Sequence, residues 1–156
     1  MKVYYRLSNK NAGISKVKLP HATKEHCLNN CVSVFGKEAI TVVGDNLNKE
    51  TEQMVQDLSL ELVNVSNGSG AGTFRDALNL AIQDNRDDEV IYLLEDDFLH
   101  TPNANKIIEE GAVIDSASVV TDYWSKRTIA GLFLMPATRH NIVHLNEALQ
   151  LKKRSK

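Results

Sequence analysis

Residues 2–108 alternate four times between a short apolar segment and an amphipathic helical pattern, and this alternation constrains the fold more than any other feature. The segments typical of strands are Lys2–Leu7, Ile40–Val43, Leu62–Val65 and Val90–Leu94. The helical patterns are Ala22–Phe35, a helix capped by Asn48, a helix along Phe74–Ile82 and a helix opened by Thr101-Pro102. Successive strand–helix units predict an α/β fold, with a mostly parallel central sheet, right-handed crossovers and helices on both faces.

Local signals mark where several of these elements begin and end. Gly36 stands where a C-cap glycine would end the first helix. Asn48 is a preferred N-cap residue, and Thr101-Pro102 combines an N-cap with a proline at the first helical position. Val90–Leu94 is continuously apolar, as expected of a strand that is covered on both faces of a parallel sheet. The third helix has one apolar face, made of Phe74, Ala77, Leu78, Ala81 and Ile82.

The C-terminal part of the chain continues the alternation. Val119–Tyr123 and Thr128–Met135 are expected to be strands. A final helix is expected from about Ala137, with apolar positions at Ile142, Leu145 and Leu149. Lys152–Lys156 is a basic tail, which we expect to be a solvated chain end rather than a nucleic-acid arm. A single domain is therefore expected over residues 1–151.

Composition excludes several classes of protein. A chain of 156 residues is the size of one domain. Eighteen basic and twenty acidic side chains give a net charge of −2, so nothing draws the whole molecule to nucleic acid or anionic membranes. Cys27 and Cys31 form no disulfide framework, and the longest apolar stretch, Ile129–Met135, is too short to span a bilayer. The N-terminus has no signal-peptide pattern. We expect a cytoplasmic chain with no transmembrane segment and no nucleic-acid partner.

Each of the four expected strands ends in a polar or charged group of residues. These groups are Arg6–Asn9, Asp45 with Asn46, Asn67–Gly70 and Glu95–Asp97. In open α/β sheets, ligands bind outside the carboxyl ends of the strands. We therefore expect the four groups to converge on one rim, and the functional site to lie there.

The acidic triplet Glu95-Asp96-Asp97 is the sharpest of these groups. Three adjacent carboxylates repel one another, so the arrangement is costly unless a cation offsets the charge. Mg²⁺ and Mn²⁺ prefer oxygen ligands and usually bind one or two carboxylates together with substrate phosphates. A solvated acidic turn is the alternative, but the position directly after a buried strand favours a metal site.

The other candidate motifs carry weaker signals. The loop Asn67–Gly72 precedes a helix, so its N–H groups could face an anion. It lacks the Gly-Lys-Ser/Thr of a P-loop, and Thr73 breaks the dinucleotide fingerprint, which leaves a flexible turn with a helix cap as the alternative. His140 and His144 have metal-ligand spacing, but without an HExxH pattern we expect surface histidines. Cys27 and Cys31 are expected to be buried apolar residues rather than ligands.

The strand ends together resemble nucleotide-sugar glycosyltransferases of the GT-A fold. The likeness rests on Tyr5–Asn9, on Asn67–Ser69 with Phe74 and Ala77, and on Val90–Pro102, and it covers roughly residues 1–123. It is a likeness to family-2-like enzymes, including glycosyltransferase domains of large algal viruses. It implies a Rossmann-like sheet of the GT-A type, Mn²⁺ or Mg²⁺ as cofactor, a UDP-sugar as donor and a glycan as acceptor. For a viral chain, the cytoplasm would be that of the host.

The resemblance also implies roles for individual residues. Glu95-Asp96-Asp97 is similar to the family's Asp-x-Asp motif, with Glu in the first place. Asp97 would hold the metal that bridges the two donor phosphates, with Asp96 as a further metal ligand. Glu95 or Asp96 would otherwise reach the ribose or a metal-bound water. The implied contacts to the nucleotide-sugar are Leu7 and Ser8 at the base, Asp45 or Asn46 at the base or ribose, Gly68 in the glycine loop, and Arg75.

The sequence departs from the family pattern after Asp122. Related domains continue there to build the acceptor side and, in inverting members, to supply a carboxylate base, whereas 34 residues follow Asp122 in this chain. Asp122 and Glu147 are the candidates for that base, and His140 is a candidate late metal ligand. The catalytic base is left unassigned, and donor binding is better supported than turnover.

The expected function is a metal-dependent glycosyltransferase that moves a hexosyl or deoxyhexosyl group from a nucleoside-diphosphate sugar to a glycan or other acceptor. The alternative is a non-catalytic module that binds nucleotide-sugar and lacks a complete acceptor site. A phosphotransfer or receiver-like domain is disfavoured, because such domains place key acids after the first strand. This chain has Ser8 and Asn9 there.

Overall fold

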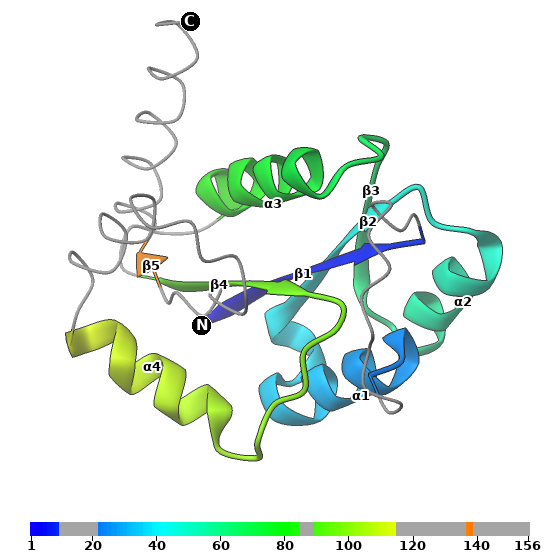
Figure 1. Ribbon diagram of the computed structural model, residues 1–156. Coiled ribbons are helices and arrows are strands. Elements are labelled where there is room, and N and C mark those ends of the chain that lie inside the picture. The colour runs from blue at the N-terminus through cyan, green and yellow to red at the C-terminus, as the bar shows by residue number, and fades with distance from the viewer. Residues whose placement is uncertain (10–21, 85–88, 115–136, 139–156) are drawn as a thin grey trace, which may run out of the picture.

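A computed structural model describes residues 1–9, 22–84, 89–114 and 137–138 (Figure 1). The strands are β1 (Lys2–Ser8), β2 (Ile40–Asp45), β3 (Glu61–Val65), β4 (Val90–Glu95) and β5 (Ala137–Thr138). The helices are α1 (Lys24–Phe35), α2 (Lys49–Asp57), α3 (Gly70–Asp84) and α4 (Ala104–Ile114), with a short 3-10 turn over Lys37–Ala39.

The strands form one sheet in the order β3-β2-β1-β4-β5. The first four strands are parallel, and β5 pairs antiparallel with the beginning of β4. The register places Arg6 opposite Glu95 and Ser8 opposite Asp45. The predicted α/β class with a mostly parallel, Rossmann-like sheet is therefore confirmed.

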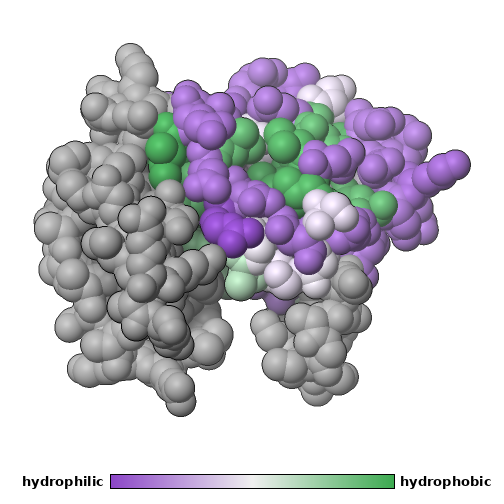
Figure 2. Space-filling model, turned by 90° about the horizontal axis from the view of Figure 1, so that it is seen from above, coloured by the Kyte–Doolittle hydropathy of each residue, from purple (hydrophilic) through white to green (hydrophobic). Residues whose placement is uncertain are grey.

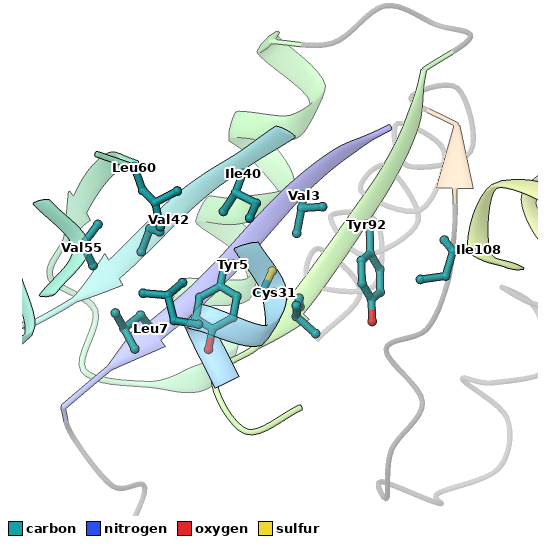
Figure 3. Close-up of a cluster of buried hydrophobic side chains, with 12 residues drawn as sticks. Val3, Tyr5, Leu7, Cys31, Ile40, Val42, Val55, Leu60, Tyr92 and Ile108 are labelled. Carbon is teal, nitrogen blue, oxygen red and sulfur yellow. The ribbon is translucent and has the colours of Figure 1, made fainter. Parts of the chain in front are cut away.

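Helices cover both faces of the sheet, because successive side chains of each strand point to opposite sides. Val3, Tyr5 and Leu7 of β1 join the larger core, which receives Leu28 and Cys31 of α1, Val55 of α2 and Ile108 of α4 (Figure 3). Tyr4 points the other way, into a smaller core with Ala77, Leu78 and Ala81 of α3. The sheet thus lies between α3 on one face and α1, α2 and α4 on the other (Figure 1).

Among the described helices, α3 alone packs on the face with the smaller core, which we call the α3 face. Figure 2 looks down on it and shows hydrophobic residues between hydrophilic ones. The half-buried apolar side chains around the smaller core are Val65, Phe74, Leu80, Ile82 and Leu93.

The chain changes direction at β1, and this creates a switch point. From β1 to β3 the chain moves outward along the sheet, with α1 and α2 on one face, and then α3 crosses back on the other face to place β4 beside β1. Crossovers of a single hand require this change of face when the direction reverses. The carboxyl ends of β1 and β4 are therefore where an open α/β sheet is expected to bind ligands.

Two helix caps agree with the sequence signals. The Asn48 side chain accepts a hydrogen bond from the Thr51 N–H at 2.9 Å and caps α2. Gly36 has a φ of 79°, which favours glycine, and its N–H donates to the Val32 carbonyl at the end of α1. The start of α1 differs slightly, because Thr23 is its N-cap and the helix begins at Lys24 rather than Ala22.

Other boundaries were predicted wrongly. Thr101-Pro102 does not open α4: the pair lies before a turn closed by the Ala104 N–H and the Thr101 carbonyl at 3.0 Å, and the helix begins at Ala104. The expected final helix from Ala137 is wrong at its first two residues, which pair with β4 as β5. The expected strands Val119–Tyr123 and Thr128–Met135, the rest of that helix and the basic tail lie outside the described residues. Among the helices that the structure describes, none has the length and apolar character needed to cross a membrane.

Candidate functional site

The carboxyl edge of the sheet brings the predicted groups together in two halves around β1. Arg6 and Ser8 of β1 meet the acidic triplet at the end of β4. On the other side, Asp45 at the end of β2 meets the loop after β3. We call these the acidic half and the Asp45 half of the rim.

In the acidic half, Arg6 connects three elements. Its guanidinium forms an ion pair with Glu95 and donates to the Gly70 carbonyl at 3.1 Å, and it lies over the Phe74 ring, 5.3 Å from the centroid. The Arg6 side chain is only 10% exposed. Burial lowers its pKa, and the neighbouring Glu95 carboxylate opposes that shift and keeps the charged form favourable. Arg6 thus neutralises the first member of the triplet and fixes it against the start of α3.

Asp96 and Asp97 lie next in this half, and both are half-buried. Asp96 Oδ2 accepts a long hydrogen bond of 3.4 Å from the Ser8 N–H and lies 3.9 Å from Lys24 Nζ at the start of α1. Behind them, the Tyr5 hydroxyl is fully buried and has no hydrogen-bond partner among the described residues. Burial raises the pKa of Tyr5, and the charges of Asp96 and, more weakly, Asp97 raise it further. The carboxylates of Asp96 and Asp97 thus lie near a Tyr5 hydroxyl that stays protonated.

Asp45 dominates the other half of the rim, and it is 1% exposed. Its Oδ1 accepts from the N–H groups of Asn67 at 2.9 Å and Gly68 at 3.1 Å, and from the Asn46 side chain at 2.7 Å. Its Oδ2 accepts from the Thr73 hydroxyl at 2.8 Å. Burial alone would raise the pKa of Asp45, but these hydrogen bonds outweigh it and hold the pKa below its usual range.

The glycine loop after β3 therefore binds a carboxylate of the chain itself. Two of its N–H groups donate to Asp45, while the Gly72 N–H donates to the Ser69 hydroxyl at 3.2 Å at the start of α3. The loop is shorter than expected, because Gly70–Gly72 already belong to α3. A Cβ on Gly72 would lie 2.7 Å from Asn67 Cβ, so this first turn of the helix needs glycine there. The anion that the loop was predicted to face is thus supplied internally, at the N-terminus of a helix, where negative charge is favourable.

The remaining predicted contacts are distributed unevenly. The Leu7 side chain is fully buried in the larger core, so only its backbone borders the rim. Asn46 is exposed, but its side chain bonds to Asp45 and accepts from Ser66. Arg75 is exposed on α3. The candidates Asp122, His140, His144 and Glu147 lie outside the described residues. Cys27 and Cys31 are both fully buried, and burial raises the pKa of Cys31 to about 12.

Sequence reasoning missed a cluster that holds the β4–α4 loop. His100 packs between Phe35 and Tyr92, and its backbone pairs with the Asn30 side chain. Neither spacing nor motif marks this contact, because Asn30 and His100 are 70 residues apart in sequence. Asn9 was expected at the rim, but its contacts were not: its side chain joins the end of β1 to Thr51 and to the Asn48 N–H at the start of α2.

A hollow of about 600 Å³ lies at the opposite, amino edge of the sheet. It is lined by Lys2, Glu38, Glu61, Asp84 and Glu89 with Met1 and Ala39. It is separated from the rim by the length of the strands, so its volume does not bear on the rim's chemistry.

Comparison with known proteins leaves the function to be argued from the rim. No protein-family model matches the sequence, and no curated protein matches it significantly.

The carboxylate oxygens of the rim are ligands of the type that hard divalent cations prefer. In the described part of the chain, no group of three or more His, Cys, Asp or Glu side chains is arranged to hold a metal ion. Asp97 and Asp96 instead offer the one or two carboxylates with which Mg²⁺ or Mn²⁺ binds when substrate phosphates complete the coordination.

Proposed function

We propose that the chain is a metal-dependent glycosyltransferase that uses a nucleoside-diphosphate sugar, in particular a UDP-sugar, as donor and a glycan as acceptor. The observation that supports this best is the position of the acidic triplet. It follows β4 directly, beside β1, at the switch point of the parallel sheet. Ligands of such sheets bind at that point, and a diphosphate needs a cation to bind beside carboxylates.

Charge balance at the acidic half agrees with this proposal. Glu95 is neutralised by Arg6, and Lys24 lies near Asp96. Asp96 and Asp97 place two further carboxylates directly beside this pair, and Mg²⁺ or Mn²⁺ usually binds one or two carboxylates together with substrate phosphates. When bound, Mn²⁺ or Mg²⁺ would act as a Lewis acid on the diphosphate leaving group and offset the charge that develops there.

The chain's own residues would hold the donor around that leaving group. Asp97 is the proposed metal ligand, with Asp96 beside it, and the Ser8 N–H orients Asp96. The ribose and base would extend from there across the end of β1, toward the backbone of Leu7 and Ser8 and the exposed face of Asn46. Arg75 is a further proposed contact on the exposed side of α3. Transfer passes through an oxocarbenium-like sugar, as in glycoside hydrolysis, so these contacts matter by positioning the donor.

A non-catalytic nucleotide-sugar-binding module is the second candidate, and one observation favours it. The carboxylates of Asp45 and Glu95 are both engaged by donors of the chain itself. Neither is set to take a proton from an acceptor hydroxyl, so the rim supports donor binding better than it supports base catalysis. The two candidates differ in one respect: the module binds donor without releasing or transferring sugar.

The test is a thermal-shift panel of nucleoside-diphosphate sugars, each with Mn²⁺ and with EDTA. At a ligand concentration about 100 times Kd, binding should stabilise the folded state by about 2.7 kcal/mol. For a domain of this size, that raises Tm by about 5–10 °C. We expect the shift for UDP-sugars with Mn²⁺ and its loss in Asp97→Asn. Asp84→Asn is the matched control, because Asp84 is exposed at the opposite edge of the sheet.

Two outcomes would count against the proposal. If no nucleotide shifts Tm in either condition, donor binding is wrong. If UDP-sugars bind with Mn²⁺ but the protein neither releases UDP nor transfers sugar to any glycan offered, the binding module replaces the enzyme.

A further inference from the structure

The side chain of Asn30 forms two hydrogen bonds with the backbone of His100. Asn30 Oδ1 accepts from the His100 N–H at 2.7 Å, and Asn30 Nδ2 donates to the His100 carbonyl at 3.1 Å. One amide thus satisfies both backbone groups of one residue, as a neighbouring strand would. It joins the middle of α1 to the loop over residues 96–103 between β4 and α4.

The ring of His100 also contacts two elements, although its buried Nδ1 has no hydrogen-bond partner among the described residues. Its Nε2 lies 2.9 Å from the Tyr92 hydroxyl. The ring meets Phe35 edge-on, with centroids 5.0 Å apart, and Tyr92 edge-on at 5.7 Å. Tyr92 belongs to β4 and Phe35 to α1, so both the sheet and the helix hold this ring (Figure 3 shows Tyr92 directed to the α1 side). We call Asn30, His100, Phe35 and Tyr92 the loop clamp.

We propose that Asn30 and His100 are positioning residues that fix the acidic half of the rim, so that Asp96 and Asp97 meet the cation and diphosphate in a preset geometry. This rests on the proposed function. β4 holds one end of the loop, and the clamp holds its middle at His100, three residues beyond Asp97. Between them, Phe98 packs against the larger core, whereas Leu99 is 42% exposed.

The physical reason is the entropy of ordering the loop. Fixing one backbone residue costs about 1–2 kcal/mol. With the clamp, the loop is already ordered in the folded protein, so ligand binding does not have to supply the free energy of ordering it. Without it, binding must order the loop, and affinity falls while the protein remains folded. Partners that orient metal ligands typically contribute about 10- to 100-fold in metal affinity.

The experiment compares Asn30→Ala with Asn29→Ala in the full chain. Asn29 is the neighbouring residue of α1; it is exposed, and its side chain donates to the Glu25 carbonyl within the helix. Alanine is a better helix former than asparagine, so both variants should fold. The readouts are the Kd for UDP with Mn²⁺ by calorimetry and hydrogen exchange of residues 96–103. Tyr92→Phe, which removes only the hydroxyl at His100, is a second test.

We expect Asn30→Ala to weaken UDP–Mn²⁺ binding by about 10-fold or more and to speed exchange over 96–103, with exchange in β1 and β2 unchanged. Tyr92→Phe should shift both readouts in the same direction by less, and Asn29→Ala should shift neither. Unchanged loop exchange in Asn30→Ala overturns the clamp. Faster loop exchange with an unchanged Kd overturns the positioning role. If the unsubstituted protein binds no UDP with Mn²⁺, the proposed function fails instead, and the positioning role fails with it.

Discussion

The two halves of the rim both place carboxylates at strand ends, but they neutralise them differently. Asp45 is enclosed by four donors of its own chain, and its two oxygens hold the glycine loop and the start of α3. In the described part of the chain, Arg6 pairs with Glu95 and Lys24 lies near Asp96, and the members of the acidic triplet are half-buried. A carboxylate enclosed by donors serves the fold, whereas half-buried carboxylates opposed by separate cations can exchange a partner for a ligand. We therefore expect the Asp45 half to stabilise the fold and the acidic half to bind a ligand.

Removing the Asp45 carboxylate should give the largest effect on stability. Asp45→Ala leaves two backbone N–H groups and the Asn46 amide without this acceptor, whereas the Thr73 hydroxyl can still donate to the Ser69 carbonyl. We expect the free energy of unfolding to fall by about 3 kcal/mol or more, measured by urea denaturation. Asp45→Asn should lose less, because it keeps one acceptor oxygen. A loss below about 1 kcal/mol in Asp45→Ala, comparable to an ordinary surface substitution, would contradict the structural role of the Asp45 half.

The Arg6–Glu95 pair connects the two halves and should rank second. Arg6→Met keeps the packing on Phe74 but leaves Glu95 without its cation, and we expect a loss of about 2 kcal/mol. Arg6→Met with Glu95→Gln should be more stable than Arg6→Met alone, because the uncompensated charge is gone. The four proteins of this double-mutant cycle are compared by their urea midpoints. Additive effects of the two substitutions would mean that the pair is not coupled.

The smallest expected effect is a pH dependence at the loop clamp. Burial lowers the pKa of His100 below that of the unfolded chain, so the unfolded state takes up its proton first as pH falls. This contribution to stability is complete above about pH 6.5, the usual histidine value, and is lost as pH falls toward the lowered folded pKa. The difference in urea midpoint between the unsubstituted protein and His100→Gln should therefore shrink from pH 7.5 to pH 5.5. A difference that is constant or grows on acidification would contradict a buried neutral His100.

Much of the fold could be predicted because its signals are local. Apolar runs, the Asn48 cap and Gly36 each depend on a few adjacent residues, and all four parallel strands are found close to their predicted bounds. The start of α4 was misjudged because Thr101-Pro102 suits a turn as well as a helix start. The strand at Ala137–Thr138 could not be foreseen, since pairing with the edge of β4 decides it.

The site divides in the same way. The acidic triplet could be located from sequence, because a parallel sheet puts everything that follows a strand on one edge. The role of Asp45 could not, because its donors come from residues 67, 68 and 73 and are brought to it only by the fold. The Asn30–His100 contact likewise joins elements distant in sequence. Polar residues that act on backbone groups of another element leave no spacing pattern.

The central claim is that the acidic half binds a metal with a diphosphate, and calorimetric titration of UDP into the full chain tests it most directly. We expect one UDP per chain in the presence of Mn²⁺, in the unsubstituted protein and in Asp84→Asn alike. Binding should be lost or at least about tenfold weaker, about 1.4 kcal/mol, with EDTA and in Asp97→Asn. UDP binding of equal strength in Asp97→Asn, or no binding in the unsubstituted protein with Mn²⁺, would contradict the claim.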